Sequence, residues 1–132
     1  MDPVIIIGTR SEGLTVLDVE RHAEGVSYAH LEIAGTGLIA SNTVFMWSNP
    51  TSLDEFLSSL ADSGRGWEGD REWDSGGELS VRARHRVSHV DLVIGMRRDG
   101  FWRAQVELTV GVGAELSSAA AAAASALGDG TA

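Results

Sequence analysis

Two histidines spaced four residues apart, His85 and His89, are the first side chains that could do chemistry. On a helix this spacing would place both imidazoles on one face, where they could bind a metal ion. The surrounding alternation is that of a β-hairpin, so the imidazoles would have to meet across two strands, with Asp91 as a third ligand. Nothing in the sequence places Asp91 there. We therefore expect a surface or hydrogen-bonded role for these histidines, and neither a metal ion nor another cofactor.

An acidic run surrounds two tryptophans, Trp67 and Trp73. Its carboxylates are Glu68, Asp70, Glu72 and Asp74. Paired carboxylates can act as general acids and bases or hold a divalent cation. Arg65 and Arg71 are interleaved with them and can neutralise them locally, so we expect a solvated loop. We expect the tryptophans to anchor this loop on the core, the alternative being an exposed aromatic contact for a partner.

Arginines recur at alternate positions of one expected strand and on its two neighbours. The residues are Arg82, Arg84, Arg86, Arg97 and Arg103. By parity they point to one face of the sheet, with Asp91 and Glu107 among them. Arginine combines a planar hydrogen-bonding fork with an apolar stem, which suits interfaces. The stripe therefore predicts either a charge-laced solvent face or a binding surface, for an acidic protein in the first place and for a nucleic acid in the second.

The charge of the chain is uneven. The net charge is −9, and all ten basic residues are arginines, yet residues 77–106 carry six arginines and three acids, a local charge of +3. Nucleic-acid binding needs a basic surface, so the overall acidity argues against it. The lack of cysteine excludes a disulfide scaffold and thiolate zinc sites. Neither a membrane-spanning stretch nor a secretory signal is recognisable, so we expect a cytoplasmic protein.

Strand patterns dominate the elements that would position these residues. Apolar and polar residues alternate, or short apolar runs occur, in four segments between residues 4 and 47 and in three between 78 and 110. Turn residues separate these segments, such as the Asp-Gly pair before Phe101. The pattern predicts an α+β fold with a mostly antiparallel sheet of about six or seven strands. One domain is expected over residues 1–132, with 128–132 frayed.

Two helices complete the expected fold. Ser52 and Glu55 fit a capping box at the start of a helix over residues 52–62, whose apolar residues fall at helical spacing. Residues 63–77 are rich in Gly, Ser, Asp and Glu and predict a loop. Residues 114–127 are nearly all alanine and serine, which predicts a terminal helix, the alternative being a low-complexity tail. We expect both helices to pack on one face of the sheet.

Residues 53–96 resemble a family of small bacterial proteins defined only as a domain of unknown function. The matching segments are Leu53-Asp54-Glu55-Phe56-Leu57, Trp67-Glu68-Gly69, Trp73-Asp74-Ser75, Glu78-Leu79, Arg84-His85 and His89-Val90. The similarity continues through Trp102 to the terminal helix and covers about two-thirds of the chain. Because the family has no assigned activity, the resemblance implies none here. Its members are similar in size and build to immunity proteins, an analogy of architecture only.

The sequence leaves three classes of function open. Small size, acidity and the lack of a complete catalytic constellation favour a non-catalytic protein-binding domain, of which an immunity-like or antitoxin-like inhibitor is one form. An enzyme or a small-molecule or metal-binding protein would use His85, His89, Asp91 or the carboxylates of residues 68–74. A self-assembling subunit would use an uncovered sheet face or edge. We expect a protein partner or self-association, with no role at a membrane.

Overall fold

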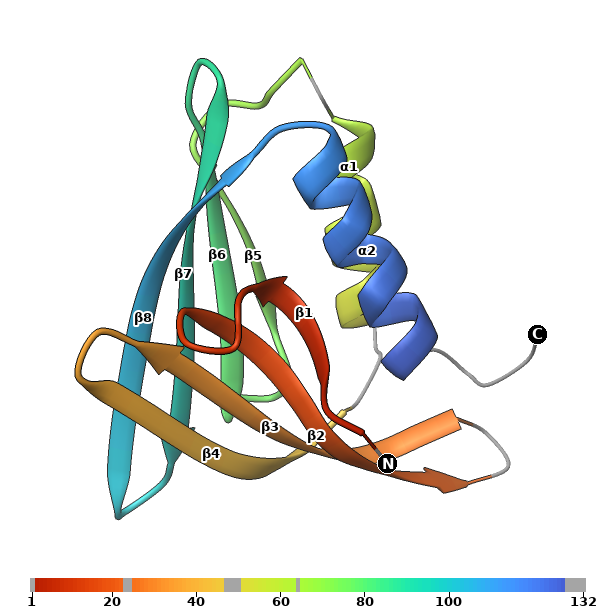
Figure 1. Cartoon of the computed structure of the whole chain (residues 1–132), viewed down its shortest axis with the longest axis vertical. Coiled ribbons are helices and arrows are strands. Elements are labelled where there is room, and N and C mark those ends of the chain that lie inside the picture. The colour runs from red at the N-terminus through yellow and green to blue at the C-terminus, as the bar shows by residue number, and fades with distance from the viewer. Residues whose placement is uncertain (1, 23–24, 47–50, 64, 128–132) are drawn as a thin grey trace.

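A computed structural model describes residues 2–22, 25–46, 51–63 and 65–127, and these form two antiparallel sheets and two helices (Figure 1). The first sheet contains, in spatial order, β1 (Val4–Gly8), β2 (Gly13–His22), β3 (Gly25–Gly35) and β4 (Leu38–Phe45). The second sheet contains β5 (Asp70–Asp74), β6 (Leu79–His85), β7 (His89–Arg98) and β8 (Trp102–Gly111). Helix α1 (Leu53–Asp62) lies between β4 and β5 in the chain, and α2 (Ala114–Leu127) follows β8.

The α+β class and the antiparallel pairing are confirmed, but the number and grouping of strands differ from the prediction. The described residues contain eight strands in two sheets instead of six or seven in one. The additional strand, β5, lies within the expected loop over residues 63–77. Its five residues do alternate in burial, with Trp73 pointing inward. Because four of these five residues are charged, the alternation is not recognisable as a strand pattern in the sequence. Pairing with β6 stabilises the strand.

Both sheets are simple meanders, in which each strand pairs with the next strand along the chain. Short turns make this possible. Between β1 and β2 the Thr9 N–H donates to the Glu12 carbonyl at 2.9 Å. Between β7 and β8 the Phe101 N–H donates to the Arg98 carbonyl, and Gly100 has a φ of +80°, which glycine adopts without strain. The Asp-Gly signal thus marks a real hairpin.

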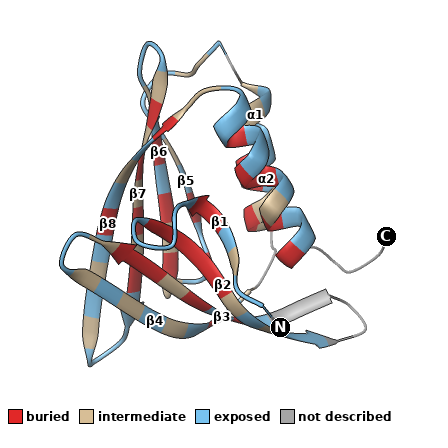
Figure 2. Cartoon of the chain, viewed as in Figure 1, coloured by how far each residue is buried: buried red, intermediate tan, exposed pale blue. Residues whose placement is uncertain are grey.

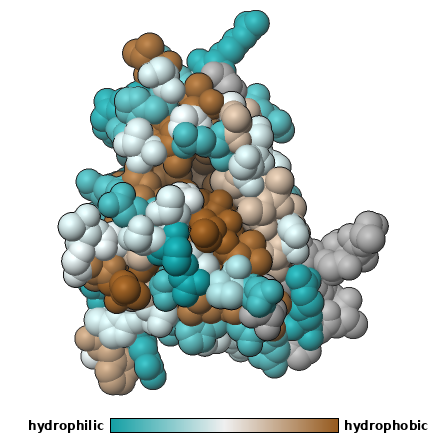
Figure 3. Space-filling view, viewed as in Figure 1, coloured by the Kyte–Doolittle hydropathy of each residue, from teal (hydrophilic) through white to brown (hydrophobic). Residues whose placement is uncertain are grey.

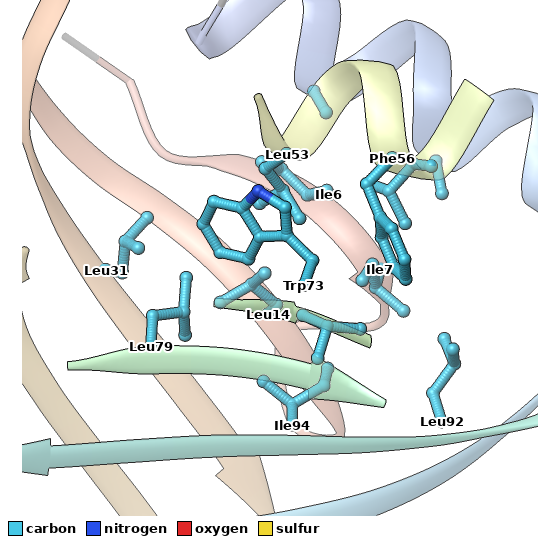
Figure 4. Packing of buried hydrophobic residues seen from close by; sticks show 14 of the residues in the cluster. Ile6, Ile7, Leu14, Leu31, Leu53, Phe56, Trp73, Leu79, Leu92 and Ile94 are labelled. Carbon is cyan, nitrogen blue, oxygen red and sulfur yellow. The ribbon is translucent and has the colours of Figure 1, made fainter. Parts of the chain in front are cut away.

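One hydrophobic core lies between the two sheets and the helix pair. Strands β6 and β7 contribute alternate apolar residues to it, whereas Ile6 and Ile7 of β1 are both buried, next to the register shift between β1 and β2 (Figure 2). Trp73 of β5 lies among Leu53, Ile6 and Leu14, which come from α1 and the first sheet (Figure 4). Residues from both sheets and both helices therefore belong to one cluster, and the second sheet has one inner, covered face.

The helices lie side by side and cover the core where the sheets diverge (Figure 1). The Ser52 half of the capping box is confirmed, because the Ser52 hydroxyl accepts from the Glu55 N–H. The Glu55 carboxylate accepts from the Ser52 hydroxyl at 2.8 Å, and not from the Ser52 backbone N–H that a full capping box would use. The alanine-rich segment is helical. Its buried positions include Ala119, Ala120 and Ala123, whose small side chains allow α2 to approach α1 closely. Among the described residues, no helix is both long and apolar enough for a membrane crossing.

The sequence predicts that Ser48-Asn49-Pro50 ends the fourth strand and that Gly64 ends the first helix. These residues, and the expected frayed end at 128–132, lie outside the described residues. Helix α1 ends at Asp62, and the backbone N–H of its C-cap, Ser63, donates to the Leu60 carbonyl.

Candidate interaction face on the second sheet

The second sheet has an outer face that points away from the core. Because side chains alternate along a strand, the residues between the buried ones project outward. The charged members of this outer face are Asp70, Glu72, Asp74, Arg82, Arg84, Asp91, Arg97, Arg103 and Glu107. The helices and the first sheet pack on the inner side, so these residues remain exposed or half-buried. The structure thus brings the expected arginine stripe together on one face.

Ion pairs connect β5 and β6 on the outer face. Asp70 lies directly opposite Arg84. Arg84 donates from Nε to Oδ1 at 2.7 Å and from Nη2 to Oδ2 at 3.2 Å. Arg82 lies 3.9 Å from the same carboxylate. The hydrogen bond from Arg84 lowers the pKa of the Asp70 carboxyl and correspondingly raises the pKa of Arg84. Asp70 therefore stays ionised and orients both arginines.

A second cluster surrounds Asp91 on β7. Arg86 lies in the turn after β6 and donates to Asp91 Oδ2 at 3.0 Å, while the Thr109 hydroxyl donates to Oδ1 at 3.3 Å. His89 Nε2 lies 3.3 Å from Oδ1. The hydrogen bond from Arg86 is the main cause of the lowered pKa of Asp91. Arg86 is thus part of the stripe, although it lies beyond the end of its strand.

A shallow hollow of about 710 Å³ lies between these two clusters. Arg82, Arg84 and Arg86 line one part of it, and Asp91 and Glu107 line another. The hollow is polar and open, unlike the mostly apolar clefts that enclose small organic ligands. Two of its arginines are oriented by neighbouring carboxylates and still carry exposed side chains. An open hollow with oriented, exposed guanidinium groups can contact charged side chains that project from another protein.

The two candidate metal-binding histidines lie on opposite faces of the second sheet. His85 has the parity of the inner residues, and its ring packs against Trp67 with centroids 5.3 Å apart. His85 Nε2 is buried and has no hydrogen-bond partner among the described residues. His89 points outward to Asp91. The hypothesis that the imidazoles meet across the strands is therefore wrong. Within the described ranges, no three His, Cys, Asp or Glu residues are grouped to hold a metal ion.

The tryptophans are positioned by hydrogen bonds to carbonyls. Trp73 is 6 % exposed, and its Nε1–H donates to the Thr51 carbonyl at 2.8 Å, which ties β5 to the start of α1. Trp67 is half-buried and donates to the Ala83 carbonyl at 3.3 Å. The Arg71 guanidinium lies 4.8 Å from the centroid of the Trp67 ring. Both residues anchor the segment on the core, and Trp73 leaves little of its surface exposed for contact with a partner.

Residues 5–130 match the model of a protein family that is described as a family of unknown function, DUF6228. The chain belongs to this family. The match includes both sheets and both helices, so the outer face is part of the DUF6228 unit. The expected resemblance to a domain of unknown function is thereby confirmed. This DUF6228 protein matches no curated protein and no solved structure.

Several residues of the outer face could not be assigned to it from the sequence alone. The composition around Asp70 and Glu72 predicts a loop, but the pairing of β5 with β6 places them opposite Arg84 and Arg82. The alternation of Asp70, Glu72 and Asp74 with inward residues was a usable signal. Alternation places Gly95 on the outer face, but the sequence alone does not show that Ser80 lies beside it.

Proposed function

We propose that this protein is a non-catalytic protein-binding domain that uses the outer face of the second sheet. The observation that carries the proposal is the uncovered row of oriented arginines on that face. Sheets are rigid supports, so the guanidinium groups are held in fixed positions before binding. Preorganised arginines lose little side-chain entropy on forming bidentate contacts with carboxylates.

The partner we infer is a protein whose surface carries carboxylates. Arg84 and Arg86 are already paired, whereas Arg82 is held only at 3.9 Å and Arg97 pairs with Asp99, which is 83 % exposed. The net charge of −9 would oppose an acidic partner at long range. At physiological ionic strength the screening length is about 8 Å, so the local arginines dominate at contact. An inhibitor of the immunity or antitoxin class is one role that would fit such a surface.

The test compares two double variants that each remove two positive charges. Arg82→Ala with Arg97→Ala alters the outer face. Arg10→Ala with Arg65→Ala is the control, since Arg10 pairs with Glu32 at the surface and Arg65 is exposed without an ion pair among the described residues. Each tagged protein is used to capture partners from host lysate, and a candidate is then purified and its binding measured by calorimetry.

We expect the face variant to weaken the purified complex at least about tenfold and the control to leave it unchanged. Light scattering of the protein alone separates partner binding from self-assembly. Equal affinities of the two variants would remove the outer face from the interface. The absence of any captured protein would reject the proposed function and favour a ligand-binding protein.

A further inference from the structure

A second, smaller hollow lies at the β7–β8 hairpin end of the outer face. Its volume is about 280 Å³. We call it the Arg97–Arg103 hollow, and its lining includes Gly77, Ser80, Gly95, Arg97, Arg103 and Gln105. These residues come from β6, β7, β8 and the loop before β6, so only the folded sheet brings them together.

Two guanidinium groups enter this hollow from neighbouring strands. Arg97 and Arg103 are direct cross-strand partners. Side chains in this relation have Cβ atoms about 5 Å apart, and like charges there are destabilising. Arg97 Nε pairs with the Asp99 carboxylate at 3.2 Å, but Asp99 is 83 % exposed and so well hydrated. Arg103 has no hydrogen bond or ion pair within the described part of the chain. Arg103 therefore brings to the hollow a guanidinium group that no described side chain pairs with, beside an arginine whose one partner is well hydrated.

Two glycines keep the space open. A Cβ atom at Gly77 would lie 2.5 Å from Arg97 Nη2, so the lack of a side chain lets this guanidinium rest against the loop. A Cβ atom at Gly95 would lie 2.9 Å from the Ser80 hydroxyl oxygen. Gly95 lies inside β7, where glycine weakens a strand and often marks the close approach of another group. At Gly77 and Gly95, therefore, any larger residue would place a side chain inside the hollow.

The polar groups of the hollow are suited to an anion. Within the described residues the Ser80 hydroxyl and the Gln105 amide have no hydrogen-bond partner and can donate. The nearby acid, Asp74, accepts hydrogen bonds from the backbone N–H groups of Gly76 and Gly77, which keep its Oδ1 in the loop. The lining itself holds two arginines and one acid, and Asp99 pairs with Arg97 from outside the lining, so Arg103 is the guanidinium that these acids leave without an ion pair among the described residues.

We propose that the Arg97–Arg103 hollow binds a small, doubly charged oxyanion, such as a phosphoryl group or a dicarboxylate. Arg97 and Arg103 would each pair with oxygen atoms of the anion, and Ser80 and Gln105 would donate to the remaining ones. Binding would also relieve the repulsion between the two guanidinium groups. This inference goes beyond the proposed function, because it requires no partner protein.

The experiment measures thermal unfolding by tryptophan fluorescence in inorganic phosphate, in malonate and in chloride at equal ionic strength. A ligand that binds only the folded state raises the unfolding temperature with its concentration. We expect phosphate or malonate, but not chloride, to raise it in a saturable manner. Saturation by phosphate alone would assign a phosphoryl ligand, and saturation by malonate alone a dicarboxylate. NMR shifts of the arginine Nε–H groups locate the bound anion.

Two variants test the site in different ways. Arg103→Gln removes one guanidinium and should weaken anion binding at least about tenfold. Gly95→Val fills the hollow with a residue that strands favour, but its Cβ atom would require the Ser80 hydroxyl, 2.9 Å away, to rotate aside. The variant should lose the anion effect, and its unfolding temperature without added anion shows whether it still folds. Arg65→Gln is the matched control and should behave like the unaltered protein. No saturable effect, or one that persists in both test variants, would overturn the inference while leaving the protein-binding proposal to its own test.

Discussion

Asp70 and Arg84 lie directly opposite each other on β5 and β6 and share two hydrogen bonds, at 2.7 and 3.2 Å. This two-point contact fixes the orientation of the guanidinium plane as well as its position. It also joins β5, an edge strand of five residues, to the middle of the sheet. One ion pair therefore shapes both the end of the sheet and the proposed interface.

The Asp70 contact makes stability depend on acid pH. Because the folded pKa of Asp70 is lowered, the unfolded chain binds its proton more readily. The stabilisation is complete above the unfolded carboxyl pKa of about 3.9 and is lost as the pH falls through the lowered folded pKa. We expect Asp70→Asn to flatten the dependence of the unfolding free energy on pH below about pH 4. Urea denaturation at a series of pH values measures this.

The control for Asp70→Asn is Glu68→Gln, at an exposed carboxylate with no hydrogen bond or ion pair in the described part of the chain. Glu68→Gln should keep the steep acid dependence. Identical profiles for both variants would show that the Asp70 pair contributes nothing to folding in solution.

The cap of α1 should contribute measurably to stability. Ser52→Ala removes the hydroxyl that accepts from the Glu55 N–H, and we expect a loss of about 1 kcal/mol in unfolding free energy. Ser58→Ala lies on the exposed side of the same helix and should change stability little, since alanine favours helix. Chemical denaturation of both proteins makes the comparison. A Ser52→Ala protein as stable as the control would contradict the cap.

Trp73 should be the costliest aromatic residue to truncate. Trp73→Ala removes a nearly buried ring from the core, for which we expect a loss of about 3–5 kcal/mol. Trp73→Phe retains most of the apolar surface but deprives the Thr51 carbonyl of its donor, so about 1–3 kcal/mol should be lost. Trp67→Phe, at a half-buried ring, serves as comparison and should cost less. Calorimetric unfolding would show whether this order holds.

The close packing of α2 predicts a sharp difference between two of its alanines. Ala123 is fully buried, so Ala123→Leu should overpack the core and cost about 1–3 kcal/mol. Ala121 is exposed on the same helix, and Ala121→Leu should be nearly neutral. Thermal unfolding of the two variants tests whether the core has room for a side chain larger than alanine at position 123. Equal melting temperatures would mean that α2 docks loosely.

The faces of the strands could be predicted from the sequence, but the grouping of strands into sheets could not. Alternation places Leu31 and Ile33 inside because a strand has a fixed period of two. Whether β4 pairs with a later strand depends on long-range packing that no local pattern encodes. The strand β5 was missed because Asp70 and Glu72 have low strand propensity and only the cross-strand arginines offset it.

The candidate face was predicted in outline and its details were not. Parity correctly brought Arg82, Arg84, Arg97 and Arg103 to one side. The same alternation also predicts that His85 and His89 lie on opposite faces. His85 is an even number of residues from Val81, which points inward, and His89 is two residues from Asp91, which points outward. The Arg97–Arg103 hollow could not be foreseen, since it depends on the register that places Ser80 beside Gly95.

The meander order of the strands has a consequence for folding during synthesis. Every strand pair joins neighbours in the chain, so both sheets can form through local contacts, which favours fast folding. Helix α1 is different, because it packs against α2, which the ribosome makes last among the described elements. Until then the apolar stripe of Leu53, Leu57 and Leu60 lacks part of its cover. A nascent chain halted before α2 should therefore bind apolar dyes and chaperones that the finished protein does not.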